Sequence, residues 1–181
     1  DSGDDTQGTG DDTQGTGDDS KTPTPMKFKN LNLEKNKANI GGAVFNSSYT
    51  DIISSKFKNN TAASGGAIYN VGIMTITESS EFLNNTAEAG GAIYNAGILT
   101  VDKTKFNSNA GGIGGAIYNT YELKVTDSQF TNTNKVVNLH GGAIINNGGA
   151  LEVSNSTFDS NLVKYYGGAI YNISGSIYGN R

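Results

Sequence analysis

Carboxylates and one imidazole are the side chains of this sequence that acid–base catalysis would use. Glycoside-cleaving chemistry needs a pair of carboxylates held at a fixed separation. After residue 25 the acids are scattered, with no D-x-D or D-D pair. Glu122 with Glu152 and Asp102 with Asp127 are the pairs that a fold could bring together. His140, the only histidine, stands beside two glycines, as an exposed loop residue would. We therefore expect no catalytic residues and no enzyme, although a carbohydrate-active enzyme remains an alternative.

Metal and cofactor chemistry has little support in the sequence. The chain has no cysteine, which excludes thiolate ligands and disulfides. Residues 4–17 are two copies of DDTQGTG, an acidic tract without the D-x-D-x-D-G order of a preformed calcium loop. We expect no cofactor and no metal site, and leave open whether the tract binds calcium.

An aromatic column is the better candidate for binding. The hexamer GGAIYN occurs four times, with variants GGAVFN and GGAIIN. If its fifth residue faces outward, the rings form a lateral strip roughly 24 Å long, suited to stacking on sugars or packing on a partner. The alternative is a column that only stabilises a sheet face. The strip comprises Phe45, Tyr69, Tyr94, Tyr118 and Tyr171, joined by Ile145.

A repeat of about 25 residues positions these side chains. The Gly pairs begin 24, 25, 24, 27 and 26 residues apart. A second column precedes them by 8 to 11 residues, and an Asn follows it by three residues in most units. Its members are Phe57, Phe82, Phe106, Phe130 and Phe158.

Apolar and polar residues alternate with period two in each unit, which predicts β-strands rather than helices. A fixed period favours a coil that stacks each unit on the last, so that equivalent residues form ladders. We expect an all-β fold, a right-handed parallel β-helix of about six coils of 24–27 residues. Within the hexamer, the second Gly, the Ile and the Asn should face inward, and the Ala and Tyr outward. The amide ladder would comprise Asn46, Asn70, Asn95, Asn119, Asn146 and Asn172.

Charge and composition divide the chain in two. Residues 1–25 carry seven Asp and one Lys and form a low-complexity acidic linker. Residues 26–181 form the repeat domain, which we expect to be truncated at its C-terminal end. We expect no nucleic-acid partner, because no basic patch with interleaved aromatics occurs. No run approaches the roughly 18 apolar residues of a membrane span, so membrane insertion by this segment is not expected.

The paired motifs GGAIYN and F-x-x-N resemble the repeat of polymorphic outer-membrane proteins. The phrases VSNSTFDSN and VGIMTITESSEFLNN resemble still more the adhesin-like surface proteins of methanogenic archaea. This resemblance covers residues 26–181 and implies a β-helix on an extracellular, cell-surface protein with adhesive duty. The sequence departs from the pattern at Leu33, at Thr133 and in the inserts 135–139 and 162–166.

Three functions follow as hypotheses. The first is a surface adhesin segment whose rod attaches to a cell-surface glycan or protein. The second is a structural stalk or filament subunit, a homo-oligomer formed by end-to-end stacking of coils. The third is the carbohydrate-active enzyme. We favour the adhesin.

Overall fold

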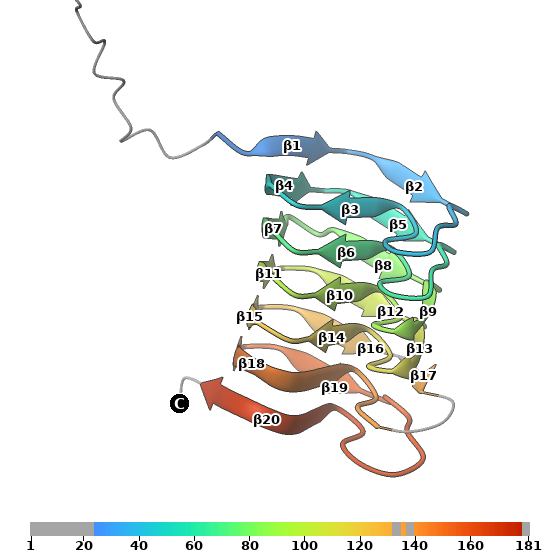
Figure 1. Cartoon of the computed structure of the whole chain (residues 1–181), viewed down its shortest axis with the longest axis vertical. Helices are drawn as coiled ribbons and strands as arrows, with labels where there is room; N and C mark the ends of the chain where they lie inside the picture. Colours follow the sequence, from blue (N-terminus) through green and yellow to red (C-terminus); the bar gives the residue numbers. More distant parts are fainter. Residues whose placement is uncertain (1–23, 132–134, 137–139, 179–181) are drawn as a thin grey trace, which may run out of the picture.

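A computed structural model describes residues 24–131, 135–136 and 140–178 of the 181-residue chain. The regular elements in these residues are β-strands (Figure 1). Within the same residues no helix is long and apolar enough to cross a membrane. Of the predicted acidic linker, residues 1–23 lie outside the described part, as does Thr133.

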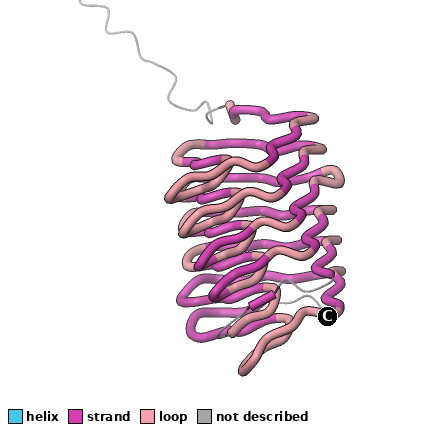
Figure 2. Tube along the Cα trace, turned by 90° about the vertical axis from the view of Figure 1, so that its right-hand side faces the viewer, coloured by secondary structure: helices cyan, strands magenta, loops and turns pink. Residues whose placement is uncertain are grey.

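The strands build three faces and a short corner ladder (Figures 1 and 2). The Leu face contains β1 (Met26–Lys29), β4 (Tyr49–Ile53), β7 (Ile73–Thr77), β11 (Ile98–Asp102) and β15 (Glu122–Thr126). The Phe face contains β2 (Asn32–Glu34), β5 (Lys56–Lys58), β8 (Glu81–Leu83), β12 (Lys105–Asn107), β16 (Gln129–Thr131) and β19 (Thr157–Asp159). The corner ladder contains β9 (Thr86–Ala89), β13 (Ala110–Ile113) and β17 (Lys135–Val136).

The third face, here called the Tyr face, carries the end of each hexamer. It contains β3 (Val44–Asn46), β6 (Ile68–Asn70), β10 (Ile93–Asn95) and β14 (Ile117–Asn119), followed by the first halves of β18 (Ile144–Ser154) and β20 (Ile170–Tyr178). β18 and β20 continue around the edge, where their second halves join the Leu face. We number the coils 1 to 6 by their Gly pairs, from Gly41 to Gly167.

Every strand pair is parallel, and its register is one repeat. Tyr94 pairs with Tyr69 on one side and Tyr118 on the other, and Val101 pairs with Ile76 and Val125. In Figure 1 the near strands run leftward and the far strands rightward as the chain descends, so the coil is right-handed. The prediction of an all-β parallel β-helix of about six coils is confirmed.

Like residues fill the interior in columns. The rings of Phe57, Phe82, Phe106, Phe130 and Phe158 stack 4.7–4.8 Å apart, and their planes differ by at most 7°. The first four of these rings have no exposed surface. A strand spacing of about 4.8 Å is also a favourable separation for aromatic rings, so one repeat length satisfies backbone and core together.

Two amide ladders close the corners. In the first, Nδ2 of Asn46 donates to Oδ1 of Asn70 at 2.7 Å, and the pattern continues through coil 6 at 2.7–2.9 Å. In the second, Nδ2 of Asn60 donates to Oδ1 of Asn85 at 3.0 Å. A buried amide needs partners for its donors and its acceptor, and a stacked copy of itself supplies both.

The predicted orientation of the hexamer is wrong for its alanine. Ala67, Ala92, Ala116 and Ala143 have no exposed surface and belong to the core. The carbonyl of Ala67 accepts hydrogen bonds from the amides of both Ala43 and Val44, at 2.8 and 3.0 Å. This shared bond interrupts the alternation of a strand, so the Ala and the following Ile both face inward.

The two glycines of each hexamer have different tasks. The first has φ between 60° and 68°, a left-handed conformation that side chains disfavour. The second allows a close approach between coils: a Cβ on Gly66 would lie 2.1 Å from the carbonyl oxygen of Gly91. This explains why the Gly pair recurs in every coil.

Candidate functional site

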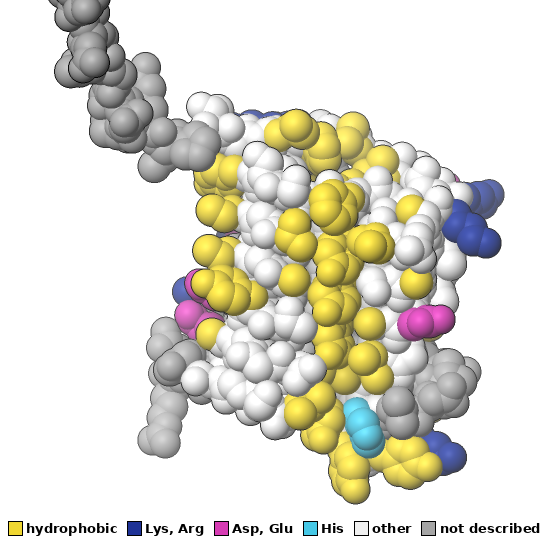
Figure 3. All heavy atoms as spheres, viewed as in Figure 1, with side chains coloured by type: hydrophobic (Ala, Val, Ile, Leu, Met, Phe, Trp, Pro, Cys, Tyr) yellow, Lys and Arg dark blue, Asp and Glu magenta, His cyan; other side chains and the backbone are white. Residues whose placement is uncertain are grey.

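The aromatic column runs along the Tyr face as the sequence predicts. The register of β3, β6, β10 and β14 places Phe45, Tyr69, Tyr94 and Tyr118 above one another. Successive ring centroids lie 5.8, 4.7 and 5.0 Å apart. Figure 3 shows hydrophobic side chains forming a band down this face.

Exposure along the strip is uneven. Phe45 is 56% exposed and Tyr69 and Tyr94 are half-buried, but Tyr118 is only 9% exposed and Ile145 only 1%. The hydroxyl of Tyr118 accepts a hydrogen bond from Nδ2 of Asn147 at 2.7 Å. The expected continuous strip is therefore interrupted: coils 1 to 3 present accessible rings, whereas Tyr118 in coil 4 is covered and coil 5 has the buried aliphatic Ile145 in place of a ring.

Tyr94 is the electrostatically distinct member of the strip. Burial raises the pKa of its phenol above the ordinary value of 10, and the neighbouring phenols of Tyr69 and Tyr118 raise it further. A hydrogen bond with the side chain of Thr120 acts in the opposite direction. The neutral form of the Tyr94 phenol is thereby favoured.

The members of the two candidate carboxylate pairs do not lie directly opposite each other. The register places Glu122 opposite Ala150 and Asp102 opposite Thr126. Oε1 of Glu152 instead accepts a hydrogen bond from Nζ of Lys124 at 2.8 Å. The register therefore aligns neither Glu122 with Glu152 nor Asp102 with Asp127.

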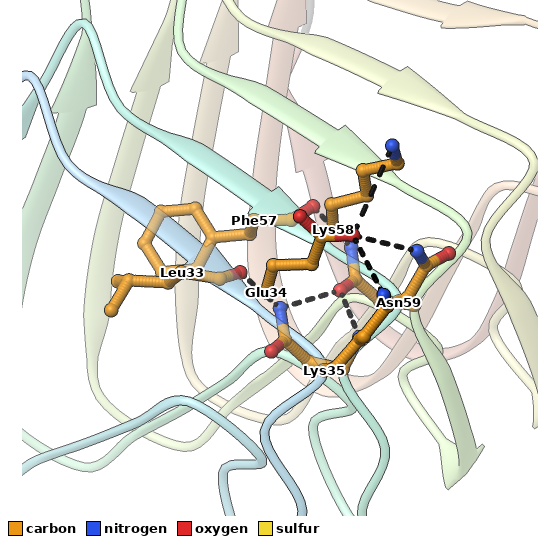
Figure 4. Close-up of polar contacts among 8 residues, drawn as sticks. Leu33, Glu34, Lys35, Phe57, Lys58 and Asn59 are labelled. Atoms are coloured by element: carbon orange, nitrogen blue, oxygen red, sulfur yellow. Dashed lines mark hydrogen bonds and ion pairs between the residues drawn. The ribbon is translucent and has the colours of Figure 1, made fainter.

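Other acids lie in exposed ion pairs. Figure 4 shows Glu34 between neighbouring coils, with its carboxylate near Lys58 and Asn59. The distances from Oε1 are 4.0 Å to Nζ of Lys58 and 3.4 Å to Nδ2 of Asn59. Nζ of Lys35 lies 3.8 Å away. Pairs of this kind contribute little to stability, typically below about 1 kcal/mol. Across the described residues, no group of three or more His, Cys, Asp or Glu is placed to hold a metal ion.

Two features escaped the sequence analysis. One is a shallow apolar hollow of about 320 Å³ at the edge between the Tyr and Leu faces. A signal was present in the phrases VGI and AGI that follow two of the hexamers. The hollow is lined by Val71, Gly72, Ile73, Ala96, Gly97, Ile98 and Tyr121.

The other is the environment of His140, which was expected to be an exposed loop residue. It is instead partly buried among tyrosines of coil 6, and its buried Nδ1 atom has no hydrogen-bond partner among the described residues. The insert before Gly167 supplies two of these tyrosines. No motif indicated that His140 would meet this insert.

These observations define a parallel β-solenoid with an aromatic lateral face. The family model of the Chlamydia polymorphic membrane protein repeat matches residues 54–71, 79–96 and 155–173. Each matched segment spans a Phe of the core column and the hexamer that follows. The chain therefore carries repeats of this type, over 55 of its 181 residues. Searches of curated proteins and of solved structures found no match.

Proposed function

We propose that this chain is a segment of an extracellular, cell-surface adhesin whose β-solenoid presents the Tyr face to another cell or to a glycan. The observation that carries the proposal is the exposed aromatic stack of Phe45, Tyr69 and Tyr94. Exposed rings on a rigid sheet bind with little loss of conformational entropy. The repeat type supports a surface location, and the likeness to adhesin-like proteins of methanogenic archaea is part of the same proposal.

Rigidity supports the adhesive role. The core Phe column and the two Asn ladders link every described coil to its neighbours, so the exposed rings keep fixed spacings. A binding surface that is already ordered loses less free energy on association than a flexible one. The partner would be a cell-surface glycan or protein, and we expect neither nucleic-acid binding nor catalytic turnover.

The test is adhesion of cells or a glycan array to beads coated with the whole chain. The triple change Phe45→Ser, Tyr69→Ser, Tyr94→Ser should lower attachment at least tenfold. A matched control, Val71→Ser, Ile73→Ser, Tyr121→Ser, alters three exposed apolar residues of the hollow and should leave attachment unchanged. If both variants lose attachment equally, or if the strip variant only unfolds at a lower temperature, the strip stabilises the sheet and does not bind a partner.

A structural filament is the second candidate. Among the described strands, β1, β2 and β3 have a partner on one side only, in coil 2, so coil 1 presents an open parallel edge. Such an edge can pair with another copy. Negative-stain images at rising protein concentration should show lengthening rods if copies stack. Short rods of constant length at every concentration would exclude this assembly.

A further inference from the structure

An aromatic cluster forms where His140 of coil 5 meets tyrosines of coil 6. The ring of His140 lies 5.0 Å from that of Tyr166 and 5.0 Å from that of Tyr171, with Tyr165 at 5.9 Å. The planes of these tyrosines differ from the imidazole plane by 21° to 53°, so the cluster presents ring faces in several directions. Figure 3 shows the imidazole, coloured cyan, among hydrophobic side chains at the lower end of the molecule.

The ladder geometry explains why these rings meet. His140 and Tyr166 occupy the same position, directly before the Gly pair, and are joined by a parallel bridge in which the amide of Gly141 donates to the carbonyl of Tyr166 at 2.9 Å. In coils 2 and 3 this column holds only the small residues Ser64 and Ala89. Coils 1 and 4 have Ile40 and Ile113 at this position, and the two rings appear with the two longest repeats, of 27 and 26 residues.

The cluster is exposed and departs from ordinary core packing. Tyr165 and Tyr166 are 56% and 61% exposed. The buried Nδ1 of His140 has no hydrogen-bond partner among the described residues, an unfavourable state that native structures seldom keep. Three tyrosine rings contact this imidazole, and local violations of this kind concentrate at binding sites.

The charges near the cluster are positive. Nζ of Lys164 lies 5.1 Å from the ring centroid of Tyr165. Residues 160–171 contain this lysine and no Asp or Glu, and the nearest acid in the sequence is Asp159. Glu88 shares the column of Tyr165, but it lies three coils away, about 14 Å at one strand spacing per coil. The ammonium of Lys164 would repel a cationic ligand and attract a carboxylate, so this cluster favours an anionic ligand.

We propose that the cluster of His140, Tyr165, Tyr166 and Tyr171, with Lys164 at its rim, is a binding site for an acidic sugar. A tyrosine ring stacks on the apolar face of the sugar ring, and the lysine ammonium pairs with its carboxylate. This inference rests on the proposed adhesive function and adds its ligand class and a second contact region, separate from the rings of coils 1 to 3.

The test compares acidic sugars with neutral counterparts on the whole chain. Saturation-transfer NMR and tyrosine fluorescence would follow binding of tetragalacturonate against its methyl ester, and of sialyllactose against lactose. We expect at least one acidic sugar to bind at least tenfold more tightly than its counterpart. Tyr166→Ser should weaken this binding at least tenfold, and Tyr166→Phe less than threefold because stacking remains. Tyr121→Ser, at an exposed tyrosine outside the cluster, is the control.

Lys164→Gln gives a second readout at an exposed residue. It should weaken acidic-sugar binding about fivefold and reduce the loss of affinity between 50 and 500 mM salt. Equal binding of acidic and neutral sugars, or no binding of either acidic probe, would overturn the inference. If the sugar test fails but the Phe45, Tyr69, Tyr94 triple variant still loses cell attachment, the adhesive function stands without the sugar site. If acidic sugars bind but the triple variant attaches to cells as well as the wild type does, the adhesive function is overturned and the sugar site stands.

Discussion

Coils 2 to 4 and coil 6 are built from the same repeat but differ in packing. In coil 3, Phe82, Ile76 and Ile93 have no exposed surface. Their counterparts in coil 6, Phe158 and Ile170, together with Val153, are only partly buried. Coils 2 to 4 have a full coil on either side, whereas coil 6 has coil 5 on one side and, on the other, only the described strand end up to residue 178.

This difference in packing indicates which coils of a repeat protein can change in sequence and length. A side chain in coils 2 to 4 is a partner to two copies of itself, so a change disturbs two contacts at once. The corner before the Gly pair in coils 5 and 6 has fewer such constraints, and there the repeat lengthens and acquires His140, Tyr165 and Tyr166. Regular coils supply rigidity, and the irregular corner has room for a binding site.

The largest expected effect is on the core column. Phe82→Ala removes a ring stacked on Phe57 and Phe106, and should lower the free energy of unfolding by about 3–5 kcal/mol. Phe158→Ala, in coil 6, should cost about half of that or less, because its ring is partly exposed and stacks only on Phe130 among the described rings. Urea unfolding followed by circular dichroism measures both. Equal losses would show that the coils share one uniform stability.

The Asn ladder should give the next effect. Oδ1 of Asn85 accepts hydrogen bonds from the backbone amide and from Nδ2 of Asn60, both at 3.0 Å. Nδ2 of Asn85 donates a hydrogen bond to the carbonyl of Phe57 at 2.9 Å. Asn85→Ala leaves the Asn60 amide and that carbonyl buried without this partner, at a cost of about 2–4 kcal/mol.

Asn161 is the matched position in coil 6. Its Nδ2 donates to the carbonyl of Phe130 at 2.9 Å, but its side chain is only half-buried, so water can replace part of what Asn161→Ala removes. The same urea titration should therefore show a loss below about 1.5 kcal/mol. A larger loss at Asn161 than at Asn85 would contradict the proposed difference between the two regions.

The second glycine of the hexamer gives another comparison of packing between coils 3 and 6. A Cβ on Gly91 would lie 2.2 Å from the carbonyl oxygen of Gly115 and 2.5 Å from that of Ala110, and both are backbone atoms. Gly91→Ala should therefore destabilise by about 1–3 kcal/mol. In Gly168→Ala the nearest atom is the carbonyl oxygen of Asn161 at 3.2 Å, so thermal unfolding should shift little. A substantial shift for Gly168→Ala would mean that coil 6 is packed as tightly as coil 3.

The regular coils were readable from the sequence because a ladder repeats one residue type at a fixed spacing. Phe57, Phe82 and Phe106 follow from position alone. The inward alanines did not follow, since a shared hydrogen bond at the carbonyl of Ala67 shifts the alternation, and no period records that bond. Burial of Tyr118 depends on Asn147 of the next coil. The cluster at His140 needs this residue of coil 5 to meet the insert of coil 6 in space, which a linear pattern does not encode.

The smallest expected effect is on folding stability at alkaline pH and concerns Tyr94. Because the pKa of Tyr94 is raised in the folded state, the unfolded chain loses the phenol proton at a lower pH than the folded chain does. The contribution of this proton to folding stability is therefore fully present below pH 10 and is lost as pH rises through the pKa of the folded state. Stability should decline in that window, and Tyr94→Phe should lessen the decline. Thermal melts between pH 8 and 12 measure it, with Tyr121→Phe, an exposed ring outside the column, as the control. An identical decline in wild type and Tyr94→Phe would show that the stacked phenols of coils 2 to 4 do not govern the alkaline limit.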